Sequence, residues 1–270
     1  MPSGESRQVQ DDALRALIER LAPVAARAQH IAVLIGAGVS AESGIPTFRD
    51  AQTGLWARYD PVMLASYEGF VSDPATVWKW YDERRAQMRQ SQPNPGHVAL
   101  AEWEERWRGM GREFTLITQN IDDLHGRAGS TGIIELHGNI WLARPLDGAM
   151  SDARRLDDCP LAEYPPCDAQ GRMLRPHVVW FGEMLDPLVI EAAFDAAAQC
   201  DLMIVAGTSS VVFPAAALPH AARRNRATLV EVNPSVTDLT AGVDFALSAP
   251  SGVALPALWE RVQACLESGV

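Results

Sequence analysis

Short apolar runs alternate along the chain with stretches in which apolar residues recur three or four positions apart. The apolar runs cover residues 30–35, 114–118, 202–206, 228–232 and 243–247. Each run is short enough to form one buried strand. The intervening stretches, such as residues 187–199 and 215–224, have the spacing of helices. Strands that alternate with helices are typical of a parallel sheet covered on both faces, so the pattern predicts an α/β fold.

Three regions depart from this alternation. Residues 1–10 are polar and lack periodicity, and a first helix is predicted from Asp11. Residues 48–98 are rich in aromatic side chains, and residues 140–175 are rich in proline, aspartate and arginine. We expect these last two regions to leave the sheet and to form a small second lobe together.

The expected organisation is a single domain assembled from interleaved parts. A chain of 270 residues is long enough to bury a substantial core. We expect this core to consist of about residues 11–49, 99–139 and 176–260. The small lobe would consist of the insertions at about residues 50–98 and 140–175.

Charge and cysteine content exclude several classes of protein. The formal net charge of −11 argues against a large nucleic-acid surface. The four cysteines are widely and irregularly spaced, unlike those of a secreted disulfide scaffold. The first residues do not have the pattern of a signal peptide, and no apolar run has the length of a membrane span. We therefore expect a cytoplasmic monomer that binds neither membrane nor nucleic acid.

The first candidate site is the glycine loop after the first predicted strand. Gly36 and Gly38 would allow backbone N–H groups to approach a pyrophosphate at the start of a helix. Position 41, where the dinucleotide-binding fingerprint has a third glycine, is alanine, which is an allowed substitute. Two glycines also occur in purely structural turns, so this loop by itself leaves both interpretations open.

Polar residues follow several of the other predicted strands. They are Gln119, Asn120, Asp122, Thr208, Ser209 and Asn233. Ligands of open α/β sheets bind at the carboxyl ends of strands, although such residues are also common turn formers and helix caps. His137 could act as a general base because histidine has an ordinary pKa near ~6.5. A lone histidine is nevertheless more often a packed or surface residue.

These motifs together resemble the sirtuin family. The segments are GAGVSAESGIPTFRD at 36–50, TQNID at 118–122, LHGN at 136–139, HVVWFGE at 177–183 and GTS at 207–209. The resemblance covers roughly residues 30 to 250. It is closest to the subgroup that includes the mitochondrial desuccinylase and the bacterial broad-specificity deacylases. It implies a Rossmann-like parallel sheet with helices on both faces, and NAD⁺ bound between this core and the small lobe.

Sirtuins consume NAD⁺ as a co-substrate, and the resemblance assigns three groups of residues to it. The residues expected at the pyrophosphate and the nicotinamide ribose are Gly36, Ala37, Gly38, Glu42, Thr47, Phe48 and Arg49. The residues expected around nicotinamide are Gln119, Asn120, Ile121 and Asp122. The residues expected at the adenosine half are Gly207, Thr208, Ser209, Asn233 and Ser251.

The resemblance also implies a reaction, the NAD-dependent removal of acyl groups from protein lysines. Its products would be nicotinamide, 2′-O-acyl-ADP-ribose and free lysine. The expected catalytic residues are His137, Asn120 and Asp122, with His137 as the general base toward the ribose 2′-hydroxyl. The acyl-lysine protein would bind as an extended peptide along Val178, Val179 and Phe181.

The expected acyl preference depends on Tyr81 and Arg84. In the desuccinylase subgroup a Tyr-x-x-Arg pair binds the distal carboxylate of a succinyl, malonyl or glutaryl group. Residues three apart share one face of a helix, and arginine can bind a carboxylate through two hydrogen bonds. The alternative is a solvated helix face with an ordinary ion pair between Asp82 and Arg85.

The chain departs from the family at the structural zinc site that typical sirtuins form with two cysteine pairs. The first pair would fall at about Pro145 and Gly148, neither of which can bind a metal. Near the expected second pair there is only Cys167, with Cys159 further upstream. We therefore expect no zinc, and a small lobe stabilised by packing.

Two other functions fit parts of this pattern. A mono-ADP-ribosyltransferase would use the same cofactor and yield ADP-ribosylated protein. A catalytically silent NAD-binding module would not need the combination of His137, Asn120 and Asp122. Identification of the products distinguishes these possibilities.

Overall fold

The computed structural model describes residues 4–46 and 60–269. Its main sheet has six parallel strands in the order β3-β2-β1-β7-β8-β9. The strands are β1 (His30–Ile35), β2 (Glu113–Thr118), β3 (Ile133–Glu135), β7 (Leu202–Ala206), β8 (Thr228–Val232) and β9 (Phe245–Leu247). Each of the five predicted strands is present within about two residues of its expected bounds, and β3 is an additional short strand. The predicted α/β class is confirmed.

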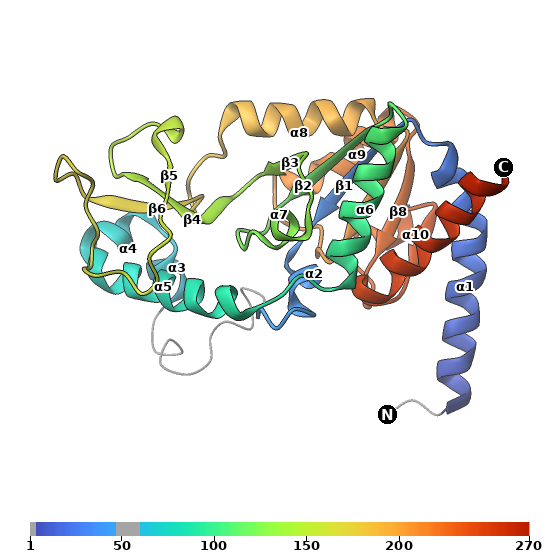
Figure 1. The fold of residues 1–270 in the computed structure, drawn as a ribbon, viewed down its shortest axis with the longest axis horizontal. Helices are drawn as coiled ribbons and strands as arrows, with labels where there is room; N and C mark the ends of the chain where they lie inside the picture. Colours follow the sequence, from blue (N-terminus) through green and yellow to red (C-terminus); the bar gives the residue numbers. More distant parts are fainter. Residues whose placement is uncertain (1–3, 47–59, 270) are drawn as a thin grey trace.

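Helices cover both faces of this sheet (Figure 1). The helices α1 (Gly4–Arg27), α6 (Pro95–Gly109) and α10 (Ser251–Ser268) pack on one face, and α8 (Pro187–Gln199) and α9 (Leu218–Arg224) on the other. Alternate residues of β1 serve the two layers, because Ile31 and Val33 belong to the first apolar core and Ala32 and Leu34 to the second. Both faces of the central strand β1 are therefore buried, as its continuous apolar run indicated.

The first helix is longer than predicted. It begins at Gly4 rather than at Asp11. Gln8 and Val9, near its start, are exposed, and this end of α1 projects beyond the sheet (Figure 1). Exposed helical positions such as Gln8 and Val9 need no apolar periodicity, so the hydrophobic pattern could not reveal this part of the helix.

Successive strands along the chain are added first on one side of β1 and then on its other side. From β1 the chain first adds β2 and β3 on one side, and later adds β7, β8 and β9 on the other. The reversal lies between β1 and β7. Ligands of open α/β sheets bind in the crevice at the carboxyl ends of the strands at such a point.

A second, antiparallel sheet forms the small lobe. It consists of β4 (Gly138–Pro145), β5 (Arg154–Arg155) and β6 (Leu174–Val178) in the order β5-β4-β6. The helices α3 (Pro61–Leu64), α4 (Tyr67–Ser72) and α5 (Pro74–Gln90) belong to the same end of the molecule (Figure 1). A third apolar core includes residues of α4, α5, β4 and β6. The two insertions therefore build one lobe, as expected.

The remaining helices are short. They are α2 (Ala37–Ala41), α7 (Leu124–Ala128) and the 3-10 turns Met150–Asp152, Ala215–Ala217 and Thr240–Gly242. Helices α2 and α7 directly follow the loops at the ends of β1 and β2. None of the helices within residues 4–46 and 60–269 is long and apolar enough to cross a membrane.

Candidate active site

Two glycine loops meet at the carboxyl ends of β1 and β7. The amide of Gly36 donates to the carbonyl of Ala206 at 2.9 Å, and that of Gly38 donates to the carbonyl of Gly207 at 2.8 Å. A Cβ atom on Gly36 would lie 2.6 Å from Cβ of Thr208, and Gly207 has a φ of +61°. Glycine is therefore required at both loops, where the two backbones approach each other too closely for a side chain.

Residues expected at the adenosine half and residues expected at the pyrophosphate come together around these loops. Nδ2 of Asn233 donates to the carbonyl of Thr208 at 2.9 Å. The carboxylate of Glu42 accepts from the amide of Gly252, next to Ser251 at the start of α10. Ala37, the first residue of α2, and Ser209, in the loop after β7, are both exposed. The expected contacts of Thr47, Phe48 and Arg49 lie outside the described residues.

The residues expected around nicotinamide follow β2, the other neighbour of β1. Nε2 of Gln119 donates to Oγ1 of Thr208 at 3.2 Å. Nδ2 of Asn120 donates to Oγ of Ser40 at 2.9 Å and to the carbonyl of Gly36 at 3.2 Å. The structure thus joins this segment to both glycine loops.

Ser40 is a site residue that the sequence analysis missed. It is buried, its Oγ accepts from Nδ2 of Asn120, and it favours the ionised form of the Asp122 carboxyl. Burial raises the pKa of the Asp122 carboxyl, while Ser40 and the amide of Leu124 favour its ionised form. The available signal was the position of Ser40 in the glycine loop, four residues after Gly36.

His137 lies just after β3 with one ring nitrogen fixed. Its Nδ1 atom is 3.0 Å from the carbonyl oxygen of Gln119. Because a carbonyl can only accept, Nδ1 carries the hydrogen and the lone pair is on Nε2. Burial lowers the pKa of His137, which keeps the ring neutral at neutral pH. His137 can therefore accept a proton at Nε2.

The segment expected to bind a peptide is joined to this histidine. The amide of Val179 donates to the carbonyl of His137 at 3.0 Å. This close approach requires Gly138, which has a φ of +77° and whose Cβ would lie 2.2 Å from the carbonyl oxygen of His177. Val178 ends β6, and the side chain of Phe181 is 55% exposed.

A buried ion pair holds the turn that follows. Arg175 is 2% exposed and binds Glu183 through two hydrogen bonds of 2.6 and 2.8 Å. Glu183 also accepts from the amide of Trp180 at 2.9 Å. Glu183 belongs to the HVVWFGE motif, but its pairing with Arg175 could not be predicted, since only the fold brings the two charged groups together behind the turn.

Tyr81 and Arg84 lie on α5, inside the small lobe. Tyr81 is 3% exposed, and burial raises its pKa to about 12. The guanidinium of Arg84 stacks on Trp80 at 4.9 Å, and burial lowers its pKa. Among the described residues no acidic group forms an ion pair with Arg84. Tyr81 therefore does not lie on a solvated helix face, and Arg84 is half-buried.

Asp82 and Arg85, on the same helix, do form the ion pair of that alternative, but the pair is buried. Oδ1 of Asp82 lies 2.9 Å from Nη1 of Arg85, and the side chains are 3% and 0% exposed. Oδ2 of Asp82 accepts from the amide of Leu161 at 2.8 Å and from Oη of Tyr164 at 2.6 Å. Arg85 also donates to the carbonyl of Leu156. The pair thus attaches residues 156–164 to α5.

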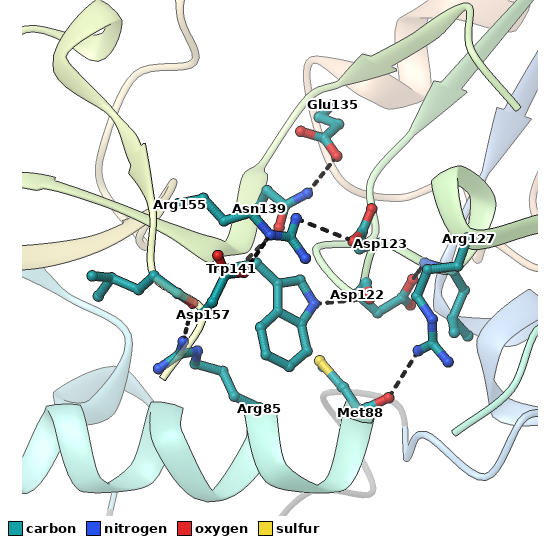
Figure 2. A network of polar contacts seen from close by, with 12 residues as sticks. Arg85, Met88, Asp122, Asp123, Arg127, Glu135, Asn139, Trp141, Arg155 and Asp157 are labelled. Carbon is teal, nitrogen blue, oxygen red and sulfur yellow. Dashed lines mark hydrogen bonds and ion pairs between the residues drawn. The ribbon is translucent and has the colours of Figure 1, made fainter. Parts of the chain in front are cut away.

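Trp141 lies between this helix and the loop after β2 (Figure 2). Its indole N–H donates to the carbonyl of Asp122 at 3.4 Å, and the guanidinium of Arg85 lies 5.2 Å from the ring centre. Its amide donates to Oδ1 of Asn139 at 2.9 Å, and Asn139 in turn donates to Glu135 at 2.7 Å. The small lobe is therefore connected directly to the Asp122 loop.

The residues at the family's zinc position do not fit a metal ion. Pro145 and Gly148 form a backbone turn at 2.9 Å, and neither has a side-chain donor. Cys159 contacts the carbonyl of Asp82 through its thiol at 3.6 Å, and Cys167 is exposed. Within the described ranges no group of three or more histidine, cysteine, aspartate or glutamate side chains could hold a metal.

The sequence and the fold both match proteins of one family. The sequence model of the Sir2 family matches residues 36–214. An NAD-dependent protein deacylase of Ralstonia nicotianae is 46% identical over 253 residues, which cover 90% of this chain and 98% of the relative.

Two solved structures extend this comparison. A Sir2 homologue in complex with NAD is similar with a TM-score of 0.84 and 43% identity, over 92% of this chain and 94% of the other. A Sir2 protein bound to an acetylated peptide is similar with a TM-score of 0.72 and 31% identity, over 90% and 94% of the two chains. The present chain belongs to the Sir2 family of NAD-dependent enzymes.

Proposed function

We propose that this protein, an NAD-dependent protein deacylase like its relatives, removes succinyl, malonyl and glutaryl groups as well as acetyl groups from lysine side chains. The products would be nicotinamide, 2′-O-acyl-ADP-ribose and free lysine. The observation that carries the acyl preference is the guanidinium of Arg84, half-buried in the small lobe beside Tyr81 and in no ion pair with an acidic group among the described residues, although the charge of Asp122 opposes the lowering of its pKa by burial.

The residues at the carboxyl ends of β1 and β7, where the order of strand addition reverses, fit NAD⁺. The glycine loops at Gly36, Gly38 and Gly207 carry no side chains that would keep a pyrophosphate away from the backbone, and Asn120 and Asp122 offer polar groups to a carboxamide such as that of nicotinamide. When bound, NAD⁺ supplies a ribose carbon from which nicotinamide can leave and ribose hydroxyls that can take an acyl group. The chain's part is to hold the two substrates and to move a proton.

His137 would perform the proton transfer. Its Nδ1 hydrogen is engaged by Gln119, and its neutral ring has Nε2 available, so we assign Nε2 as the general base toward a ribose hydroxyl. The carbonyl of His137 is bonded to Val179. This bond would keep the base in register with the bound acyl-lysine.

We propose that the protein substrate binds as an extended segment along Val178, Val179 and Phe181. Strand β6, which ends at Val178, lies at the edge of the small sheet, and an extended peptide can add to such an edge through main-chain hydrogen bonds that depend little on side-chain identity. The Sir2 protein bound to an acetylated peptide supports a peptide ligand for this fold. The net charge of −11 favours basic protein segments over nucleic acid as partners.

The environment of Arg84 favours an acyl chain that ends in a carboxylate. Arginine stays protonated, and a charged group removed from water is costly unless it is paired. Stacking on Trp80 covers one face of the guanidinium but supplies no negative charge. A succinyl carboxylate would provide the missing partner through charge-assisted hydrogen bonds, whereas an acetyl group would not.

The direct test is a product assay on matched peptides. The protein is incubated with NAD⁺ and one peptide carrying acetyl-, succinyl-, malonyl- or glutaryl-lysine, and the products are identified by mass spectrometry. We expect free lysine peptide and O-acyl-ADP-ribose, with succinyl-lysine used at least as well as acetyl-lysine. ADP-ribosylated protein without free lysine peptide would instead identify a mono-ADP-ribosyltransferase, and binding without turnover would identify a silent module.

A further inference from the structure

One hydrogen bond connects α5, the helix that carries Tyr81 and Arg84, to residues 178–181, along which we propose that the peptide binds. Nε1 of Trp180 donates to the hydroxyl oxygen of Tyr81 at 2.9 Å across 99 residues of sequence. Trp180 and Tyr81 are 3% exposed each. The bond is therefore formed away from water, where losing it leaves a polar group unsatisfied.

The indole ring of Trp180 is held on several sides. The guanidinium of Arg175 lies 3.6 Å from the ring centre, and the ring of Phe70 lies 5.1 Å away at 36°. The main chain of Trp180 is fixed by its bond to Glu183, which also pairs with Arg175. The amide of the next residue, Phe181, donates to the carbonyl of Ala65 at 2.8 Å. Trp180 is thus a rigid donor.

The direction of this hydrogen bond determines what Tyr81 can offer a ligand. An indole N–H can only donate, so the hydroxyl oxygen of Tyr81 is the acceptor. The hydroxyl hydrogen of Tyr81 then remains available, and no described residue accepts it in a hydrogen bond. The pKa of Tyr81, raised to about 12 by burial, keeps that hydrogen in place at neutral pH. Tyr81 is prepared to donate to an acceptor such as a carboxylate.

We infer that Trp180 is a positioning residue for acyl specificity, which orients the Tyr81 hydroxyl as a donor toward acyl chains that end in a carboxylate. This inference rests on the proposed function. It adds that the segment that binds the peptide also sets the geometry of the acyl pocket. Without the indole N–H, the Tyr81 hydroxyl can rotate, and its hydrogen no longer has a fixed direction toward the acyl chain.

The test is Trp180→Phe, which keeps an aromatic ring and removes the N–H. We expect the ratio of kcat/KM for a succinyl-lysine peptide to kcat/KM for the acetyl peptide to fall about five- to tenfold, the effect of one buried hydrogen bond. The matched control is Trp78→Phe. Trp78 belongs to the same apolar core and donates to the carbonyl of Leu174 at 2.8 Å, so its loss should leave the succinyl-to-acetyl ratio unchanged.

A double-mutant cycle separates positioning from general destabilisation. In a Tyr81→Phe background, Trp180→Phe should no longer change the succinyl-to-acetyl ratio, because the hydroxyl it orients is absent. If Trp180→Phe does not fold, benzothienylalanine at position 180 replaces it, since this residue has the shape of tryptophan and a sulfur in place of N–H.

The outcomes distinguish the inference from the proposal on which it rests. An equal loss of both activities in Arg84→Met would overturn the proposed acyl preference. Selective losses in Arg84→Met and Tyr81→Phe, with an unchanged ratio in Trp180→Phe, would overturn only the role of Trp180. The role of Trp180 would also be overturned if Trp78→Phe lowered the succinyl-to-acetyl ratio as much as Trp180→Phe does. Loss of any buried hydrogen bond in the small lobe would then have the same effect.

Discussion

The carbonyl oxygen of Gln119 lies 3.0 Å from Nδ1 of His137, and this contact determines which ring nitrogen can accept a proton. Since the carbonyl holds the Nδ1 hydrogen, only Nε2 is a base. Gln119 is itself tied to the second glycine loop through Thr208. The tautomer of His137 is thus set by the same segment that we expect to surround nicotinamide.

The first prediction follows from this tautomer. His137→Ala should lower the rate of deacylation by about 10²–10⁴, the usual effect of losing a general base, and leave NAD⁺ affinity within a few-fold. Turnover on an acyl peptide and calorimetric titration with NAD⁺ measure the two quantities. His220→Ala, at an exposed histidine, is the control and should be inert. Near-normal turnover of His137→Ala would exclude this role.

The second prediction concerns Arg84. Arg84→Met should depress desuccinylation at least tenfold and leave deacetylation nearly intact, because charge-assisted hydrogen bonds contribute about 1.5–3 kcal/mol. Kinetics on paired peptides decide the matter. Lys79→Met removes a positive charge from an exposed position of the same helix and should change neither activity. A parallel fall in both activities would mean that Arg84 has a structural role.

The third prediction concerns the buried pair of Asp82 and Arg85. Asp82→Ala leaves Arg85 buried without its partner, so we expect it to lower the free energy of unfolding by about 3 kcal/mol. Urea denaturation measures the loss. Asp157→Ala removes the acid of an exposed pair with Arg155 and should cost well under about 1 kcal/mol. Similar losses in the two variants would contradict the importance of burial.

The fourth prediction concerns metal content. Because the residues at the family's zinc position cannot bind a metal, the purified protein should contain no stoichiometric zinc. It should also keep its unfolding midpoint in strong chelator, since chelation unfolds only a lobe whose folding depends on the metal. Elemental analysis and thermal melts with and without chelator test this. One zinc per chain, removed together with stability, would refute it.

The fifth prediction is a loss of stability in mild acid. His97 and His125 are buried with ring centres 4.5 Å apart, and burial lowers the pKa of His97 to about 4 and that of His125 well below its usual value. An unfolded histidine takes up its proton near pH ~6.5, so between about pH 6.5 and 5 the unfolded chain binds more protons than the native one. Stability must therefore decrease as the pH falls, by up to ~1.4 kcal/mol per pH unit for each histidine.

Urea denaturation at several pH values in this window measures the slope. His125→Leu removes one of the histidines whose pKa is lowered by burial, and its stability should depend less steeply on pH than that of the wild-type protein. His220→Leu, at the exposed histidine, should leave the slope unchanged. Identical slopes in all three proteins would assign the acid sensitivity to other groups.

The strands and the loops at their ends could be predicted because their causes are local. A strand buried on both faces has to be apolar throughout, as in residues 202–206, and the turn after it requires glycine where backbones come close. Parallel strands end at the same edge of a sheet, so Asn120 and His137 could be expected near Gly36 before any contact was known. The resemblance to the sirtuin family added their roles.

The tertiary structure decided which side chains are buried and which partners they meet. Tyr81 and Arg84 could equally have lain on a solvated helix face, and only packing of α5 against the second sheet places Tyr81 under Trp180. Asp82 reaches Leu161, 79 residues away, in a region without periodicity. Such contacts depend on how distant segments pack, and hydrophobic spacing along the chain carries information only about neighbouring turns and strands.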